Sequence, residues 1–179
     1  MDESRHERFE EVAPGLVGPL RRYLARRTDP DTAEDVLAEP LLVCWRRVAE
    51  VPDQPLPWAY AVAALCLRNA ERAARRQRRT AAKVATLDPP ATVVAEAAGP
   101  AEGHAEVHAA LARLRSEDAE LLRLWAWEQL APGEIATVLG ISANAAHSRL
   151  HRARRRLADR LRKDPAAAGH EESTEGRRS

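Results

Sequence analysis

Aromatic residues are scarce in this chain, at 4% of 179 residues with a single Phe. Cysteine is rarer still: Cys44 and Cys66 stand alone in apolar stretches without a Cys-x-x-Cys pair, so we predict buried thiols and no disulfide or zinc site. Residues 1–11 are charged and lack an apolar signal core. The longest apolar run, 58–67, is ten residues, too short to span a bilayer. These absences predict a cytoplasmic chain without membrane insertion.

Catalytic machinery is also missing from the sequence. We find no nucleophile–base set, no phosphate-binding loop and no cluster of metal ligands, so we predict neither an enzyme nor a bound cofactor. Two histidine pairs, His147 with His151 and His104 with His108, have the i, i+4 spacing of metal ligands. Because no Asp, Glu or Cys is positioned to complete either set, we interpret both pairs as incidental and predict no metal site.

Charge is balanced in sum but segregated along the chain. The formal net charge is +1, with 31% charged and 45% hydrophobic residues, enough apolar material for a core. Arginines gather in 68–79 and 149–163. Because a local basic patch rather than the total charge governs binding to a polyanion, nucleic acid remains a candidate partner.

The stretch 128–161 predicts two helices joined by a tight corner. Pro132 suits a first helical position, Gly140 suits a helix end, and Ser142 can cap the next helix. In the second helix apolar residues recur at steps of three and four: Ala146, Leu150, Ala153, Leu157 and Leu161. The opposite face is polar and basic. The pattern predicts a helix-turn-helix.

A helix of this kind fits the major groove, where base edges offer donors and acceptors, while further arginines suit phosphates. The side chains that we predict to contact duplex DNA are Ser142, Asn144, His147, Ser148, Arg149, His151, Arg152 and Arg155. The alternative is an ordinary helical hairpin whose arginines are only solvated. The coincidence of corner, cap, apolar seam and basic face favours DNA binding.

These residues also carry a family resemblance. GEIATVLGIS at 133–142, followed by SRLHRARRRL at 148–157, closely resembles region 4 of bacterial sigma factors of the extracytoplasmic-function (ECF) group. The resemblance implies that the second helix reads the −35 promoter element. Ala146 and His147 stand where family members usually carry a Val-Lys pair.

The N-terminal part is similar to region 2 of the same family. We expect helix on both sides of a break at Pro14-Gly15, and a second helix from about 31 to 48 with outward acids. Resemblance implies that Asp35 and Glu39 dock on RNA polymerase; the alternative is a core helix with solvated acids. Pro40 departs from the family pattern and is expected to cost about 3 kcal/mol or kink the helix.

A long helix is predicted over 58–79, after the Pro-rich loop 50–57, with an apolar first half and a basic second half. It is similar to the family regions that open the −10 element and hold its non-template strand. Holding single-stranded DNA requires a basic track and a stacking surface. The residues implied for this role are Trp58, Tyr60, Arg68, Asn69, Arg72, Arg75, Arg76 and Arg79. For Trp58 we favour core packing over base stacking.

The predicted fold is all-α, with two small helical domains: a region 2-like bundle over 1–79 and a region 4-like helix-turn-helix domain over 104–163. Residues 80–103 are rich in Ala, Pro and Gly without a lasting period, which predicts a flexible linker. In the second domain we expect Ser116 to cap a helix that buries Trp125. The polar residues 164–179 predict a disordered tail.

We therefore predict a sigma factor that binds core RNA polymerase and directs promoter-specific transcription initiation. Its expected partners are core RNA polymerase, promoter DNA as duplex −35 and opened −10 elements, and, as the resemblance implies, an anti-sigma protein. Two alternatives stay open: a helix-turn-helix regulator that binds DNA without polymerase, and a sigma-like decoy that acts through protein contacts alone.

Overall fold

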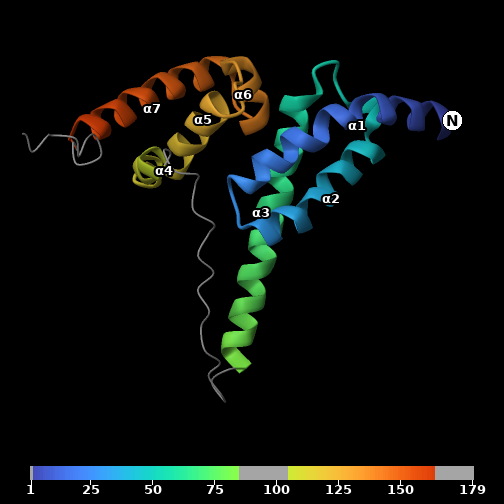
Figure 1. The fold of residues 1–179 in the computed structure, drawn as a ribbon, viewed down its shortest axis with the longest axis horizontal. Coiled ribbons are helices and arrows are strands. Elements are labelled where there is room, and N and C mark those ends of the chain that lie inside the picture. The colour runs from blue at the N-terminus through green and yellow to red at the C-terminus, as the bar shows by residue number, and fades with distance from the viewer. Residues whose placement is uncertain (1, 85–104, 164–179) are drawn as a thin grey trace, which may run out of the picture.

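The protein is described here by a computed structural model that covers residues 2–84 and 105–163 (Figure 1). Every regular element in these ranges is helical, which confirms the all-α prediction. The elements are α1 (Asp2–Ala25), α2 (Pro30–Arg46), a short 3-10 turn η1 (Val48–Glu50), α3 (Pro55–Val84), α4 (Ala105–Ala112), α5 (Ser116–Ala126), α6 (Pro132–Leu139) and α7 (Ala143–Lys163). Most of the predicted linker and the predicted tail lie outside the described residues.

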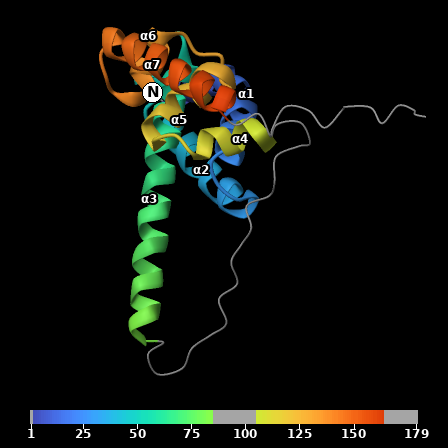
Figure 2. The ribbon, with the colours of Figure 1, turned by 90° about the vertical axis from the view of Figure 1, so that its left-hand side faces the viewer.

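Helices α1, α2 and α3 pack against one another in the N-terminal part (Figures 1 and 2). Leu16, Leu20 and Leu24 of α1 are fully buried in this core. The break expected at Pro14-Gly15 was wrong, because α1 runs without interruption through Pro14. A proline inside a helix costs about 3 kcal/mol, so burial of this leucine stripe outweighs the local preference.

Helix α2 begins at a cap and continues through its internal proline. The Asp29 carboxylate accepts a hydrogen bond from the Thr32 N–H at 2.9 Å, which satisfies a free donor of the first turn. Pro40 lies inside the helix, and its ring is fully buried. The helix still reaches Arg46, so core packing of the proline ring offsets the hydrogen bond that its nitrogen cannot donate.

Helix α3 is longer than predicted at both ends. It starts at Pro55 rather than 58 and reaches Val84, past the predicted domain end at 79. Prolines at 55 and 57 are compatible with its first turn, where backbone N–H groups need no partner within the helix. The second half of α3 projects away from the other helices as a stalk (Figure 2).

The predicted corner between α6 and α7 has the expected chemistry. Helix α6 begins at Pro132, and Gly140 ends it in the left-handed conformation, with φ 63° and ψ 38°. The Ser142 hydroxyl accepts from the Ala145 N–H at 3.2 Å and thereby caps α7. Ala146, Leu150 and Ala153 are buried against α5 and α6, which confirms the predicted seam over most of its length.

Three details of this C-terminal part were predicted wrongly. Leu161 is 43% exposed, because α7 there extends beyond its packing partners. Trp125 is 39% exposed and lies under the Arg154 guanidinium, 4.5 Å from the ring centroid. Ser116 is the first residue of α5 and not its cap, which is Arg115 without a side-chain hydrogen bond.

The two parts of the chain also contact each other. Helix α3 packs against α6, and one continuous cluster of buried residues includes Leu67 of α3 together with Ile135 and Val138 of α6. The described residues therefore form a closed arrangement, with α7 and the stalk of α3 pointing in different directions from a common centre (Figure 1).

Candidate nucleic-acid interface

The outer face of α7 carries the residues predicted to contact duplex DNA. All eight are exposed: Ser142, Asn144, His147, Ser148, Arg149, His151, Arg152 and Arg155. The opposite face is fixed to the protein through Ala146 and Ala153, both fully buried. Because small residues let α7 approach its neighbours closely, the polar face is held on a rigid support. Its donors and acceptors have the chemistry needed for base edges and phosphates in a major groove.

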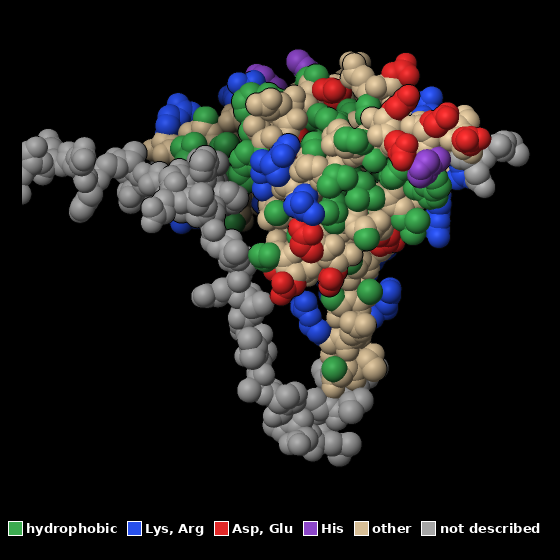
Figure 3. Space-filling model, turned by 45° about the vertical axis from the view of Figure 1, so that its right-hand side comes forward, with side chains coloured by type: hydrophobic (Ala, Val, Ile, Leu, Met, Phe, Trp, Pro, Cys, Tyr) green, Lys and Arg blue, Asp and Glu red, His purple; other side chains and the backbone are tan. Residues whose placement is uncertain are grey.

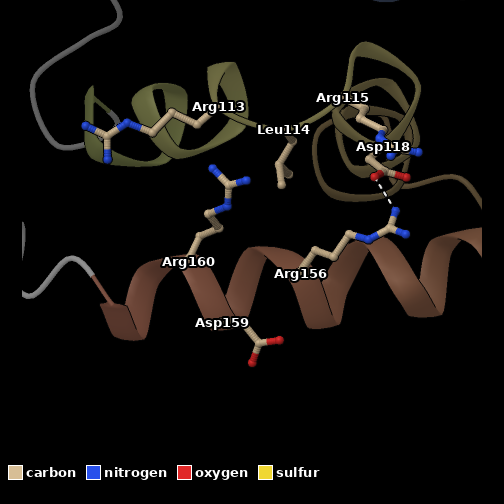
Figure 4. A pocket seen from close by; sticks show the side chains of 7 residues that line it. All are labelled: Arg113, Leu114, Arg115, Asp118, Arg156, Asp159 and Arg160. Atoms are coloured by element: carbon tan, nitrogen blue, oxygen red, sulfur yellow. Dashed lines mark hydrogen bonds and ion pairs between the residues drawn. The ribbon is translucent and has the colours of Figure 1, made fainter.

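The orientation of α7 is also fixed by an ion pair on its flank. The Arg156 guanidinium donates to the Asp118 carboxylate of α5 at 2.5 Å, and the Asp118 residue is only 8% exposed. Arg115 and Arg160 lie around the same hollow, which has a volume of about 370 Å³ (Figure 4). Asp159 also lines the hollow, and so does a fourth arginine, Arg113. The hollow therefore adds positive charge beside the polar face of α7.

The stalk of α3 carries the second predicted basic surface. Arg68, Asn69, Arg72, Arg75, Arg76 and Arg79 are all exposed. Arg72 donates to the Asn69 side-chain oxygen at 2.5 Å, and Arg75 pairs loosely with Glu71 at 3.7 Å. Figure 3 shows Lys and Arg side chains on both sides of the stalk. Because the stalk projects from the other described helices, a nucleic-acid strand can reach its exposed arginines.

The two aromatic residues predicted for the −10 element differ in their accessibility. Tyr60 is 4% exposed and stacks on Tyr23 of α1, with ring centroids 4.9 Å apart. Burial raises its pKa to about 12. Its placement on a base-stacking surface is therefore corrected: Tyr60 is a core residue here, because the N-terminal bundle closes over its ring. Trp58 is half-buried beside Arg47, whose guanidinium lies 5.8 Å from the ring centroid.

The acids predicted to dock on polymerase lie on the outer surface of α2. Asp35 and Glu39 are both exposed, one helical turn apart, while Val36 and Leu37 between them face the core. Leu42, one turn further along, is 45% exposed. Single exposed leucines are common on any protein surface, so these positions establish the accessibility of the two acids and no more.

Sequence reasoning missed an ion-pair cluster that joins the two parts of the chain. Arg27, at the end of α1, donates to Glu120 of α5 at 2.9 Å and to Glu128 beyond α5 at 3.1 Å. Arg26 donates to the other Glu128 oxygen at 3.1 Å. The Tyr23 hydroxyl donates to Glu120 at 3.4 Å. The acids and the arginines lie about a hundred positions apart in the chain, so no local pattern indicates their pairing.

The electrostatics of this cluster keep the Arg27 guanidinium charged. Burial alone lowers the Arg27 pKa, but neighbouring Tyr23, Glu120 and Glu128 together raise it above its ordinary value. Burial raises the pKa of the Tyr23 phenol far beyond neutral pH, so the hydroxyl stays a donor. The Arg27 guanidinium also lies 3.5 Å from the centroid of the Tyr23 ring, a cation–π contact.

A groove of about 620 Å³ runs beside the cluster and is lined by both parts of the chain. Arg68 of α3 and Arg149 of α7 both line it, together with Arg27 and Glu120. Thus one residue of the predicted −10 set and one of the predicted −35 set lie on the same groove.

In residues 2–84 and 105–163, no set of three His, Cys, Asp or Glu side chains is arranged to hold a metal ion. His104 lies outside the described residues, as does the side chain of His108. Over the same ranges, no helix combines the length and the apolar character needed to cross a membrane.

Comparisons with known proteins agree with the fold and with the α6–α7 motif. Residues 104–157 match the family model "Sigma-70, region 4". The structure is similar to the sigma factor RpoE, solved in complex with the anti-sigma factor NepR from Bartonella quintana, with TM-score 0.57 and 21% identity, covering 87% of this chain and 96% of that one. It is also similar to CnrH, solved in complex with the cytosolic domain of CnrY, with TM-score 0.54 and 20% identity, covering 92% and 91%. A search of curated proteins gave no match.

The segment that matches the sigma-70 region 4 model thus contains α4, α5, α6 and most of α7. Over 87% of its length the chain shares its fold with a solved sigma factor. The resemblance drawn from the sequence is confirmed.

Proposed function

We propose that this chain is a sigma factor of the ECF group, which binds core RNA polymerase in the cytoplasm and directs promoter-specific transcription initiation. The observation that carries the proposal is the exposed polar and basic face of α7, mounted on a buried seam inside a segment that matches sigma-70 region 4. In this function α7 lies in the major groove of the −35 element.

Arg152 gives the most direct test of −35 recognition, because it is exposed on the outer face of α7. Replacing it with alanine should cost about 1–3 kcal/mol and relax sequence choice if its guanidinium contacts a base. Arg162→Ala is the matched control: it removes the same charge in the last turn, where Arg162 pairs with Asp159. We expect this control to weaken binding slightly and equally on all sequences. A promoter profile unchanged by Arg152→Ala would refute base reading there.

The stalk of α3 is proposed to hold the opened −10 strand. Its projecting position and its exposed arginines support this role. Charge reversal at Arg72 and Arg76 should abolish strand opening, while polymerase binding survives. Opening is measured by the permanganate reactivity of unpaired thymines. Arg78→Glu changes charge on a different side of the same helix and should have a smaller effect. Normal opening by the double variant would exclude the stalk from this step.

Polymerase docking is assigned to Asp35 and Glu39 of α2, whose exposure and continuous helix support it. We propose an anti-sigma protein as a further partner, since the Bartonella quintana sigma factor was solved with one. The chain supplies no catalytic residue of its own in this proposal, and polymerase performs the chemistry of RNA synthesis.

A further inference from the structure

The ion-pair cluster between the two parts of the chain suggests a regulatory role for the closed arrangement. We infer that Arg26, Arg27, Glu120 and Glu128 form a latch that holds the isolated chain closed, and that the chain must open to bind both promoter elements. The requirement for opening rests on the proposed function; the existence of the latch does not.

The geometry of a promoter makes the closed form incompatible with simultaneous binding. Elements centred about 35 and 10 positions upstream are about 85 Å apart along B-DNA, at about 3.4 Å per base pair. In the closed form Arg68 and Arg149 line one groove. From there the predicted −10 set extends about 16 Å along α3 to Arg79, and the predicted −35 set about 10 Å along α7 to Ser142. Together these two lengths come to about 26 Å, far short of about 85 Å.

The charged groups of the latch are buried or partly buried and are paired with one another. The Arg27 and Glu128 side chains are 6% and 3% exposed, so their charges are shielded from solvent. Each arginine reaches Glu128 through a different carboxylate oxygen, and Glu120 accepts from both Arg27 and Tyr23. In such a network, replacing one partner leaves the others buried without compensation, which strongly disfavours the closed form. Separation of the two parts returns all four charged groups to water.

Glu128→Lys is the variant that tests the latch. Glu128 lies after α5, and it accepts hydrogen bonds from Arg26 and Arg27, which both belong to the other part of the chain. Reversing its charge should raise the ratio of open to closed molecules by about 100-fold or more. Arg26→Glu changes the partner on the other side of the interface, just after α1. It should also raise the ratio of open to closed molecules.

The matched control is Glu34→Lys, which makes the same charge change at an exposed Arg21–Glu34 pair inside the N-terminal part. Its side chains are 56% and 59% exposed, so loss of the pair should leave the closed form dominant. Circular dichroism of each variant would confirm that helix content is retained.

The readout is the distance between two spin labels in the full chain, measured by pulsed electron paramagnetic resonance without DNA or polymerase. Labels at Ala38→Cys on α2 and Thr137→Cys on α6 use exposed positions, while the native cysteines are buried. We expect one short, narrow distance distribution for the parent and for Glu34→Lys. Both latch variants should give a broad, longer distribution.

Two results would overturn the latch: a broad distribution in the parent chain, or a narrow distribution in both latch variants. Failure of the proposed sigma function would look different, because the distances would follow the prediction while polymerase binding was absent. If the latch and the sigma function are both correct, the Glu128→Lys variant should bind core polymerase more tightly than the parent chain. The gain in affinity should equal the factor by which the open fraction rises.

Discussion

The corner between α6 and α7 offers a sharp test of the structure, because two glycines there should respond in opposite ways to the same added methyl group. Gly140 has φ +63°, whereas Gly133 lies in the first turn of α6. A Cβ atom at either position meets no atom within 4 Å, so packing clashes are excluded as a cause at both. The backbone preference of alanine therefore decides whether each substitution raises or lowers the free energy of unfolding.

Alanine in the left-handed conformation costs about 1–2 kcal/mol, so Gly140→Ala should destabilise the protein by that amount. Alanine in a helix is favoured over glycine by about 0.5–1 kcal/mol, so Gly133→Ala should stabilise it. With a urea m-value of about 2 kcal/mol/M, the midpoint should fall by about 0.5–1 M for the first variant and rise by about 0.3–0.5 M for the second.

The assay is urea unfolding of the full chain, followed by circular dichroism. Gly140→Asn is a useful third variant, because asparagine tolerates the left-handed region and should cost less than alanine. If Gly140→Ala proved neutral, the corner would not have the described conformation in solution. If both alanine variants were equally destabilising, steric crowding rather than backbone conformation would be responsible.

Two other predictions test burial. Leu150→Ala should lower the free energy of unfolding by about 2–5 kcal/mol because Leu150 is 5% exposed, whereas Leu161→Ala, at 43% exposure, should cost far less; equal losses in urea unfolding would contradict the packing of α7. Burial raises the pKa of both Cys44 and Cys66 to about 11, so neither thiol should react with Ellman's reagent at pH 8 until the protein is unfolded; rapid reaction of the native protein would show that the N-terminal core is open.

The parts of the structure that the sequence predicted well are those decided by neighbours in the chain. Pro132, Gly140 and Ser142 act through backbone geometry within one or two turns, so the corner was predictable from residue types alone. The buried seam of α7 follows from helical periodicity in the same way. At Leu161 the apolar period of α7 continues, but no neighbouring helix in the described part of the chain covers this residue. Periodicity in one helix does not show where the helix packed against it ends.

The features that were missed depend on contacts between distant segments. Tyr60 is buried because Tyr23, on another helix, stacks on it. Helix α1 passes through Pro14 because its leucines pack on α2 and α3, which no local rule indicates. The pairing of Arg27 with Glu128 joins segments that the sequence assigns to separate domains. The sequence shows the sign of each charged residue, but it does not show which distant residue pairs with it.

The central claim is that this chain directs promoter-specific initiation by RNA polymerase. The most direct measurement is in vitro transcription with purified core polymerase from a related bacterium, a pool of promoter fragments, and this protein added or omitted, with start sites determined by sequencing. The account predicts discrete start sites that appear only when the protein is present. Start sites that are the same with and without it, or no transcripts despite demonstrated polymerase binding, would contradict the claim.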